Sequence, residues 1–111
     1  MLFRSGIEAV ARNMTLETRP FDAARYLETV EDVAGFIDEA FKIGDPAFIA
    51  HAFGVVARAR GMTQIAKDAG LSRESLYKAL SETGKPEFST VLRVAKALGL
   101  RMTVAADAAV F

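Results

Sequence analysis

The residues between positions 63 and 80 have the types and the spacing that a DNA-reading surface needs. Thr63 can cap a first short helix, Gly70 can take the left-handed conformation that ends it, and Ser72 can cap a second helix. Leu76 and Leu80 lie four residues apart on one face of that second helix, so the polar residues between them point outward. This pattern predicts two short helices joined by a tight turn, the arrangement in which a helix-turn-helix reads DNA.

The outer face of the second helix offers hydrogen-bonding groups to bases and phosphates. Arg73, in the first turn, could bind guanine through two hydrogen bonds, and Ser75 and Lys78 could contact a base or a phosphate. Glu74 could accept a bond from cytosine, but the helix dipole alone also favours an acid there. Tyr77 could bond a phosphate, although its place beside the apolar stripe favours covering the core. Each residue could instead be an ordinary exposed side chain.

Two nearby positions could also bind phosphate. Lys85 lies in the loop after the second helix, and Ser89 and Thr90 lie at the start of the next one. Free backbone N–H groups at a helix N-terminus favour anions. The alternative for Ser89 and Thr90 is plain helix capping.

Apolar periodicity and capping residues predict the elements that position this unit. Thr29 and Asp32 form a variant of the capping box, and Asp45 followed by Pro46 begins another helix, which Gly61 ends. We expect helices at about 22–28, 30–43, 46–60, 64–69, 73–81 and 90–98, and a strand at about 100–104. These elements form a single expected domain over residues 21–111, which follows a variable, mobile extension over residues 1–20. The apolar faces outside the two short helices are expected to bury Val30, Val33, Ala34, Ile37, Ala40, Phe41, Phe48, Ile49, Ala52, Phe53, Val56, Val91, Leu92, Ala95 and Leu98.

The expected strand has a consequence for assembly, because a lone strand leaves its backbone groups unpaired. A second copy of the chain is the preferred partner, with Leu100, Met102 and Val104 as the residues of the dimer strand. Pairing with the N-terminal segment, or a merely extended tail, are the alternatives.

Composition argues against catalysis and against a membrane protein. The chain of 111 residues has no cysteine and one histidine, so the common zinc sites lack ligands. That histidine, His51, has no carboxylate three or four residues away to orient it as a base. We therefore expect no enzyme activity, no metal and no cofactor. The longest uncharged apolar stretch is too short to span a bilayer, so a cytoplasmic protein is expected.

The net charge is zero, but the charge is unevenly distributed. Residues 1–44 carry five basic and eight acidic side chains, whereas residues 45–111 carry nine and six. All nine basic residues of the second part lie between Arg58 and Arg101, around the two short helices. This asymmetry favours nucleic acid at one end and another partner at the other, although ordinary solvated charge would also explain it.

Three stretches carry a family resemblance: ARARGMTQIA at 57–66, GLSRESLYKAL at 70–80 and GKPEF at 84–88. Together they resemble the addiction-module antidote family, a HigA-like branch of the phage-repressor-like helix-turn-helix antitoxins, from about residue 21 to about residue 100. The resemblance implies an all-α, five-helix, phage-repressor-like fold, to which the residue pattern adds an N-terminal helical extension and a short C-terminal β-strand. It also implies a usually dimeric protein that neutralises a small RelE-like or HigB-like ribonuclease toxin and represses the operon encoding both.

Carried over by position, Gln64 would open the first of the two short helices and touch a phosphate, while Arg73, Glu74, Ser75 and Lys78 would lie on the recognition helix. The complete set of predicted DNA-binding residues is Thr63, Gln64, Ser72, Arg73, Glu74, Ser75, Tyr77, Lys78, Lys85, Ser89 and Thr90.

The expected partners are double-stranded DNA with a palindromic operator, a small basic toxin and a second copy of the chain. The acidic outer face of residues 30–42 could meet the toxin, or could simply keep the helix soluble. Two alternatives remain for the function: a stand-alone helix-turn-helix transcriptional repressor, and a toxin-masking interaction module that does not bind DNA.

Overall fold

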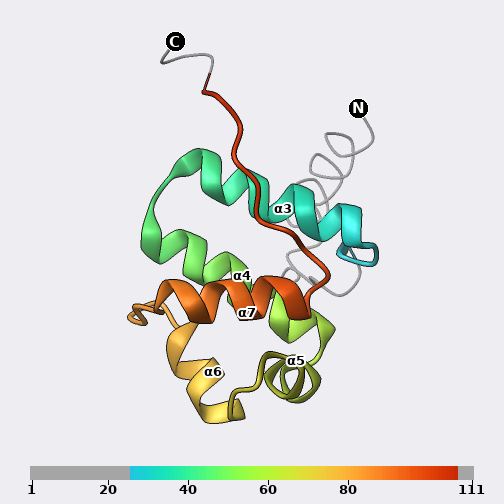
Figure 1. Cartoon of the computed structure of the whole chain (residues 1–111), viewed down its shortest axis with the longest axis vertical. Helices are drawn as coiled ribbons and strands as arrows, with labels where there is room; N and C mark the ends of the chain where they lie inside the picture. Colours follow the sequence, from blue (N-terminus) through green and yellow to red (C-terminus); the bar gives the residue numbers. More distant parts are fainter. Residues whose placement is uncertain (1–25, 108–111) are drawn as a thin grey trace, which may run out of the picture.

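The computed structural model describes residues 26–107, and this part of the chain contains five helices and no strand (Figure 1). The helices are α3 (Val30–Ile43), α4 (Pro46–Arg60), α5 (Met62–Ala69), α6 (Arg73–Ala79) and α7 (Phe88–Ala97). The all-α expectation is therefore confirmed for the described residues. The extension over residues 1–20, and most of the helix expected at about 22–28, lie outside them.

The first two helices begin and end at the expected residues because local capping chemistry sets their ends. The backbone N–H of Asp32 donates to Thr29 Oγ1 at 3.0 Å, and the N–H of Thr29 donates to Asp32 Oδ2 at 3.1 Å, which completes the capping box. At the start of α4 the N–H of Phe48 donates to Asp45 Oδ2 at 3.0 Å, and Pro46 takes the first helical position.

Two predicted caps are wrong. Gly61 follows α4 and directly precedes α5, which starts at Met62, so Thr63 lies inside the first turn of α5 and caps nothing. The N-cap of α7 is Glu87, which makes no side-chain capping bond, so Ser89 also lies inside its helix. The start of α7 is solvent-exposed, and water can satisfy N–H groups there without a side-chain cap.

The remaining ends also shift. α6 ends at Ala79, two residues earlier than expected, and Ser81 instead donates its hydroxyl to the carbonyl of Lys78 at 2.9 Å. α7 ends at Ala97, close to the expected end, and Gly99 follows with a positive φ of 80°.

The core forms where the helices cross. α3 packs on α4, and α5 packs on α4, α6 and α7. In Figure 1, α3 lies at one end of the described part, α5 and α6 lie at the other end, and α7 crosses between them. The largest fully buried side chains are Val33, Phe53, Val56, Leu76, Leu80 and Val94.

Four large hydrophobic residues of the expected core are instead exposed: Val30, Phe41, Phe48 and Leu92. Val30 and Phe48 belong to the first turns of their helices, and Phe41 to the last turn of α3, where fewer neighbouring elements cover a side chain. On α7 the buried stripe passes through Val94, which the sequence analysis missed, and leaves Leu92 at its border. Ala34 is exposed as well, while Ile49 and Val91 are half-buried.

The strand expected at about 100–104 is not present. The chain leaves α7 through a bond from the Leu100 N–H to the Ala95 carbonyl, at 2.9 Å, and then runs irregularly past α3 (Figure 1). Leu100 and Met102 pack partly against the helical core, whereas Val104 is 99% exposed. The alternation therefore reflects the packing of Leu100 and Met102 on the helices, which does not continue to Val104, and no neighbouring strand edge is present among the described residues.

None of the helices in residues 26–107 is long and apolar enough to cross a membrane.

Candidate nucleic-acid interface

The turn between α5 and α6 is built around a left-handed glycine. Gly70 has φ 71° and ψ 33°, a conformation that a side chain at Cβ disfavours. Its N–H donates to the Lys67 carbonyl at 3.1 Å, and the N–H of Leu71 donates to the Ala66 carbonyl at 2.9 Å. These two bonds close α5 and turn the chain sharply into the next helix, as the sequence analysis expected of Gly70.

Two serines close the start of α6. Ser72 is the N-cap, as expected, and its Oγ accepts the N–H of Ser75 at 3.0 Å. The Ser72 hydroxyl also donates to Ser75 Oγ at 2.8 Å. Two of the three predicted DNA-binding serines are therefore joined to each other, and they fix the beginning of α6 through their own hydrogen bonds.

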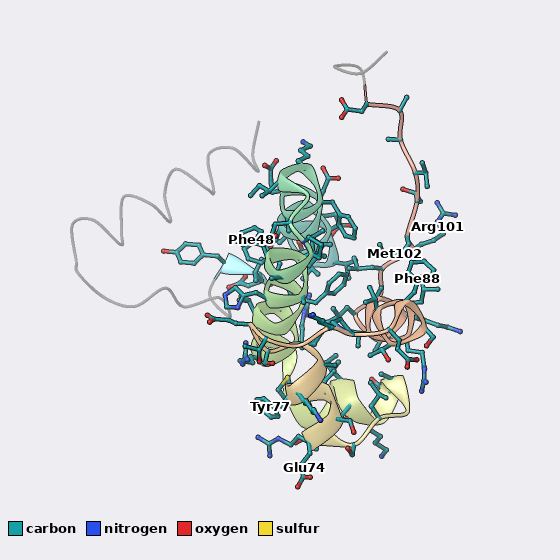
Figure 2. All side chains as sticks on the ribbon, turned by 90° about the vertical axis from the view of Figure 1, so that its left-hand side faces the viewer. Phe48, Glu74, Tyr77, Phe88, Arg101 and Met102 are labelled. Carbon is teal, nitrogen blue, oxygen red and sulfur yellow. The ribbon has the colours of Figure 1, made fainter. Side chains whose placement is uncertain are left out.

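Leucines on the inner side of α6 attach it to the core. Leu76 is fully buried, and Leu80, the C-cap, is 1% exposed. The predicted outward side chains Glu74, Ser75 and Lys78 are all exposed. Figure 2 shows Glu74 and Tyr77 at the same end of the molecule, far from Phe88, Arg101 and Met102. The structure thus presents the outer face of α6 to solvent.

The ring of Tyr77 lies near two arginines from different helices. Its side chain is 37% exposed, so it borders the core without being covered by it. Arg73 Cζ lies 5.4 Å from the centre of the Tyr77 ring, and Arg73 Nη2 donates to the Tyr77 hydroxyl at 3.4 Å. Arg58 Cζ, from the last turn of α4, lies 5.8 Å from the same ring centre. Both distances allow a cation–π attraction.

The remaining predicted residues lie on α5, in the loop and on α7. Thr63 and Gln64 are exposed in the first turn of α5, and Gln64 Nε2 donates to Asp68 Oδ1 at 2.8 Å. Lys85 is exposed in the loop between α6 and α7. Ser89 is exposed and Thr90 half-buried in the first turn of α7.

Two arginines that connect different helices were not predicted from the sequence. Arg58 appeared only as a basic residue of α4, because nothing in a linear sequence brings it to Tyr77. Arg93, on α7, donates from Nη1 to the Ala69 carbonyl at 3.4 Å and so connects α7 with the end of α5. The spacing of four between Gly54 and Arg58 indicates that both lie on one face of α4.

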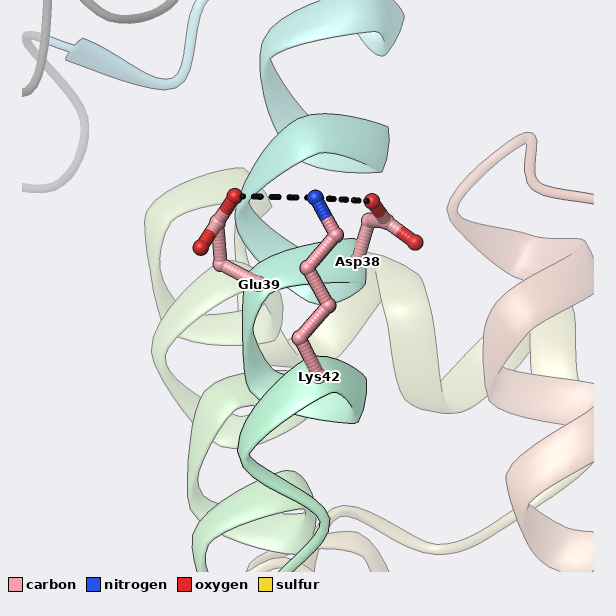
Figure 3. A network of polar contacts seen from close by, with 3 residues as sticks. All are labelled: Asp38, Glu39 and Lys42. Atoms are coloured by element: carbon pink, nitrogen blue, oxygen red, sulfur yellow. Dashed lines mark hydrogen bonds and ion pairs between the residues drawn. The ribbon is translucent and has the colours of Figure 1, made fainter. Parts of the chain in front are cut away.

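The opposite end of the molecule is acidic. The outer side of α3 carries Glu31, Asp32, Asp38 and Glu39. Lys42 Nζ lies 3.4 Å from Glu39 Oε1 and 3.5 Å from Asp38 Oδ2 (Figure 3). Glu39, and then Asp38, raise the pKa of Lys42 above its ordinary value of 10.5, so this ammonium group stays charged at neutral pH. One cation therefore offsets part of the acidic charge on this helix.

Within residues 26–107, no group of three or more His, Cys, Asp or Glu side chains is arranged to hold a metal ion. The chemistry that the described residues offer is hydrogen bonding and charge on an exposed helix.

Comparison with known proteins gives the class of this protein. A family model described as "Probable addiction module antidote protein" matches residues 17–106. The match covers most of the chain, which therefore belongs to this antidote family. Membership supports an antitoxin role in an addiction module and implies a cognate toxin as the partner.

A relative from Haemophilus influenzae (strain ATCC 51907 / DSM 11121 / KW20 / Rd) is 47% identical over 91 residues. The alignment covers 82% of this chain and 94% of that protein, which is described as "Uncharacterized protein". No solved structure gives a significant match to the chain.

Proposed function

We propose that this antidote is a DNA-binding antitoxin that neutralises a RelE-like or HigB-like ribonuclease toxin and represses the operon encoding both proteins. The observation that carries the DNA-binding part is the pair α5 and α6. A tight turn at Gly70 joins them, buried leucines hold α6, and its polar side faces solvent. These are the features that a helix-turn-helix needs.

The dimensions of α6 suit a DNA groove. Its seven residues form an α-helix, which with its side chains is about 10–12 Å in diameter. The major groove is roughly 12 Å wide and admits one helix. In this mode Arg73 and Lys78 reach DNA from the exposed side, where Arg73 reads a base and Lys78 binds a phosphate.

A dimer would read a palindromic operator, because each copy presents one α6. The two half-sites would then lie roughly 34 Å apart, one helical turn of DNA. Sedimentation of the free protein gives its oligomeric state, and a footprint on its own promoter gives the spacing of half-sites. A monomer both free and on DNA would contradict this part of the proposal.

The acidic side of α3 is our candidate for the toxin surface. It lies at the end of the described part away from α6 (Figure 1), and ribonucleases that bind RNA are typically basic. Co-expression with the neighbouring gene, followed by affinity capture and a growth-rescue test, would examine it. Charge reversal of Glu31 and Asp38 should weaken capture of the neighbour's product, whereas reversal of the loop residue Glu82 should not.

Substitutions on α6 test the DNA-binding proposal. Lys78→Ala should lower affinity for every duplex and reduce the slope of log affinity against log salt by about 0.9, the loss of one phosphate contact. Arg73→Ala should instead reduce discrimination at one base position. Titrations of the promoter of the protein's own gene, and of a scrambled duplex, at several salt concentrations distinguish the two effects. Wild-type affinity and salt slope in both variants would overturn the assignment.

The two other functions remain testable with the same material. A stand-alone repressor would bind the promoter with no toxin gene beside its own. A masking module would bind the neighbour's product stably and show no salt-dependent binding to the promoter.

A further inference from the structure

We infer that Arg58 is a second arginine of the DNA interface, contacting a backbone phosphate from α4, and that Tyr77 positions both Arg58 and Arg73. The inference rests on the proposed DNA-binding function and extends it to a helix outside the predicted helix-turn-helix. Arg58 was absent from the residues that the sequence pattern selected.

The geometry brings two guanidinium groups to one exposed ring. Arg73 approaches from one turn earlier in α6, and Arg58 approaches from the last turn of α4, with Cζ-to-ring-centre distances of 5.4 and 5.8 Å. The hydroxyl of Tyr77 also accepts a bond from Arg73 at 3.4 Å. A single side chain therefore holds cations from two helices that are separate in sequence.

A glycine gives Arg58 the space it uses. A Cβ atom added at Gly54 would lie 3.1 Å from Arg58 Nη1 and 2.9 Å from the carbonyl oxygen of Leu80. The guanidinium group thus lies back along α4, against the point where α4 meets the end of α6. With the Tyr77 ring beside it, the long side chain is held in place before any ligand arrives, which reduces the entropy cost of binding.

The charges around this ring favour an anion. Both guanidinium groups lie near one ring, and among the described residues neither forms a salt bridge with a carboxylate. Lys42 on α3 is the opposite case, because two carboxylates already pair with it. A phosphate would supply a negatively charged partner for Arg58, because planar guanidinium groups bind phosphate through paired hydrogen bonds. The helix that carries Tyr77, α6, also carries the exposed Lys78, for which we propose a contact with a DNA phosphate. We therefore assign the phosphate at Arg58 to the DNA backbone as well.

The test compares two uncharged variants of Arg58 with an alanine variant of an arginine elsewhere in the chain. Arg58→Ala removes the side chain, and Arg58→Gln keeps most of its length without the charge. Arg101→Ala is the control, since it removes the same charge from the end of the molecule away from Tyr77 (Figure 2). Each variant is checked for a native circular-dichroism spectrum. It is then titrated with the promoter duplex of the protein's own gene and with a scrambled duplex of equal length.

Both Arg58 variants should bind each duplex at least about tenfold more weakly at low salt, because a charge-assisted hydrogen bond is lost. Their salt slopes should fall by about 0.9, while Arg101→Ala should leave affinity and slope unchanged. Tyr77→Leu should reproduce the weaker binding, and Tyr77→Phe should keep most of the affinity because the ring remains. Adding Arg58→Gln to Tyr77→Leu should then cost little more, as expected of a positioning residue that acts through Arg58.

The outcomes separate the inference from the proposed function. If the wild type binds the promoter with a clear salt dependence but both Arg58 variants behave like Arg101→Ala, the inference is overturned and the function stands. If the wild type shows no salt-dependent binding to either duplex, both are overturned. If Tyr77→Leu leaves the salt slope at the wild-type value while the Arg58 variants lower it, Tyr77 has no positioning role.

Discussion

Replacing Gly54 with alanine should destabilise this protein, although the same change stabilises most helices. Gly54 is buried in the middle of α4. In an open helix, alanine is favoured over glycine by roughly 1 kcal/mol. Here the new methyl group would lie 2.9 Å from the Leu80 carbonyl oxygen, 3.1 Å from Arg58 Nη1 and 3.4 Å from Leu80 Cβ. The first of these distances is too short for any real Cβ contact.

The size of the effect follows from which neighbour can move. Arg58 Nη1 is the end of a flexible side chain and can give way cheaply, but the Leu80 oxygen is backbone at the end of α6. Overpacking of this kind costs about 1–3 kcal/mol, which exceeds the propensity gain. We therefore expect a net loss of about 1 kcal/mol in the free energy of unfolding, or a fall of roughly 4–8 °C in Tm for a domain of this size.

Urea unfolding followed by circular dichroism measures this change, and a double-mutant cycle identifies its source. Gly54→Ala should remain destabilising when Arg58→Ala is also present, because the backbone contact persists. Two results would refute the reasoning. One is a stability gain of about 1 kcal/mol in the single variant, which would mean that α6 moves away at no cost. The other is full recovery in the double variant, which would make Arg58 the obstructing group.

Three further changes test the fold. Gly70→Ala should lower the free energy of unfolding by roughly 1–2 kcal/mol because φ is 71° at this position, and Gly70→Asn should lower it less. Thermal unfolding of both variants measures the difference between them. Thr29→Ala removes one half of the capping box of α3 and should cost about 1 kcal/mol in urea unfolding, and an unchanged midpoint would contradict it. Met102→Ala should lower Tm measurably because its side chain packs on the core, whereas Val104→Ala, at a 99% exposed position, should leave Tm unchanged. Equal changes in Tm for the two variants would mean that Met102 does not pack on the helices.

Local chemistry explains why several elements could be predicted from the sequence. The caps at Thr29, Asp45 and Ser72 involve residues at most three positions away in sequence, so a linear pattern contains both partners. The same holds for the left-handed turn at Gly70. Thr63 and Ser89 were wrongly predicted to be N-caps. Their helices begin just before them, at Met62 and at Phe88, and neither helix has a side-chain cap that a sequence pattern could indicate.

Tertiary contacts explain the rest. The alternation over residues 100–104 is the same for a strand and for a chain that touches helices with every second side chain, and only the packing of Leu100 and Met102 separates the two. The approach of Arg58 to Tyr77 depends on how closely α4 meets α6, which Gly54 permits. The outer face of α6 was predictable, whereas its arginine neighbour from α4 was not.

The junction at Gly61 constrains how the chain length can vary. This residue ends α4, through bonds from its N–H to the carbonyls of Ala57 and Arg58, and its own carbonyl accepts the N–H of Ile65 in α5. One inserted residue here would break either the bonds from the Gly61 N–H into α4 or the bond from the Ile65 N–H to the Gly61 carbonyl, and would move α5 relative to α4. Insertions should therefore be tolerated better between the exposed residues Glu82 and Thr83 than at this single-residue connection.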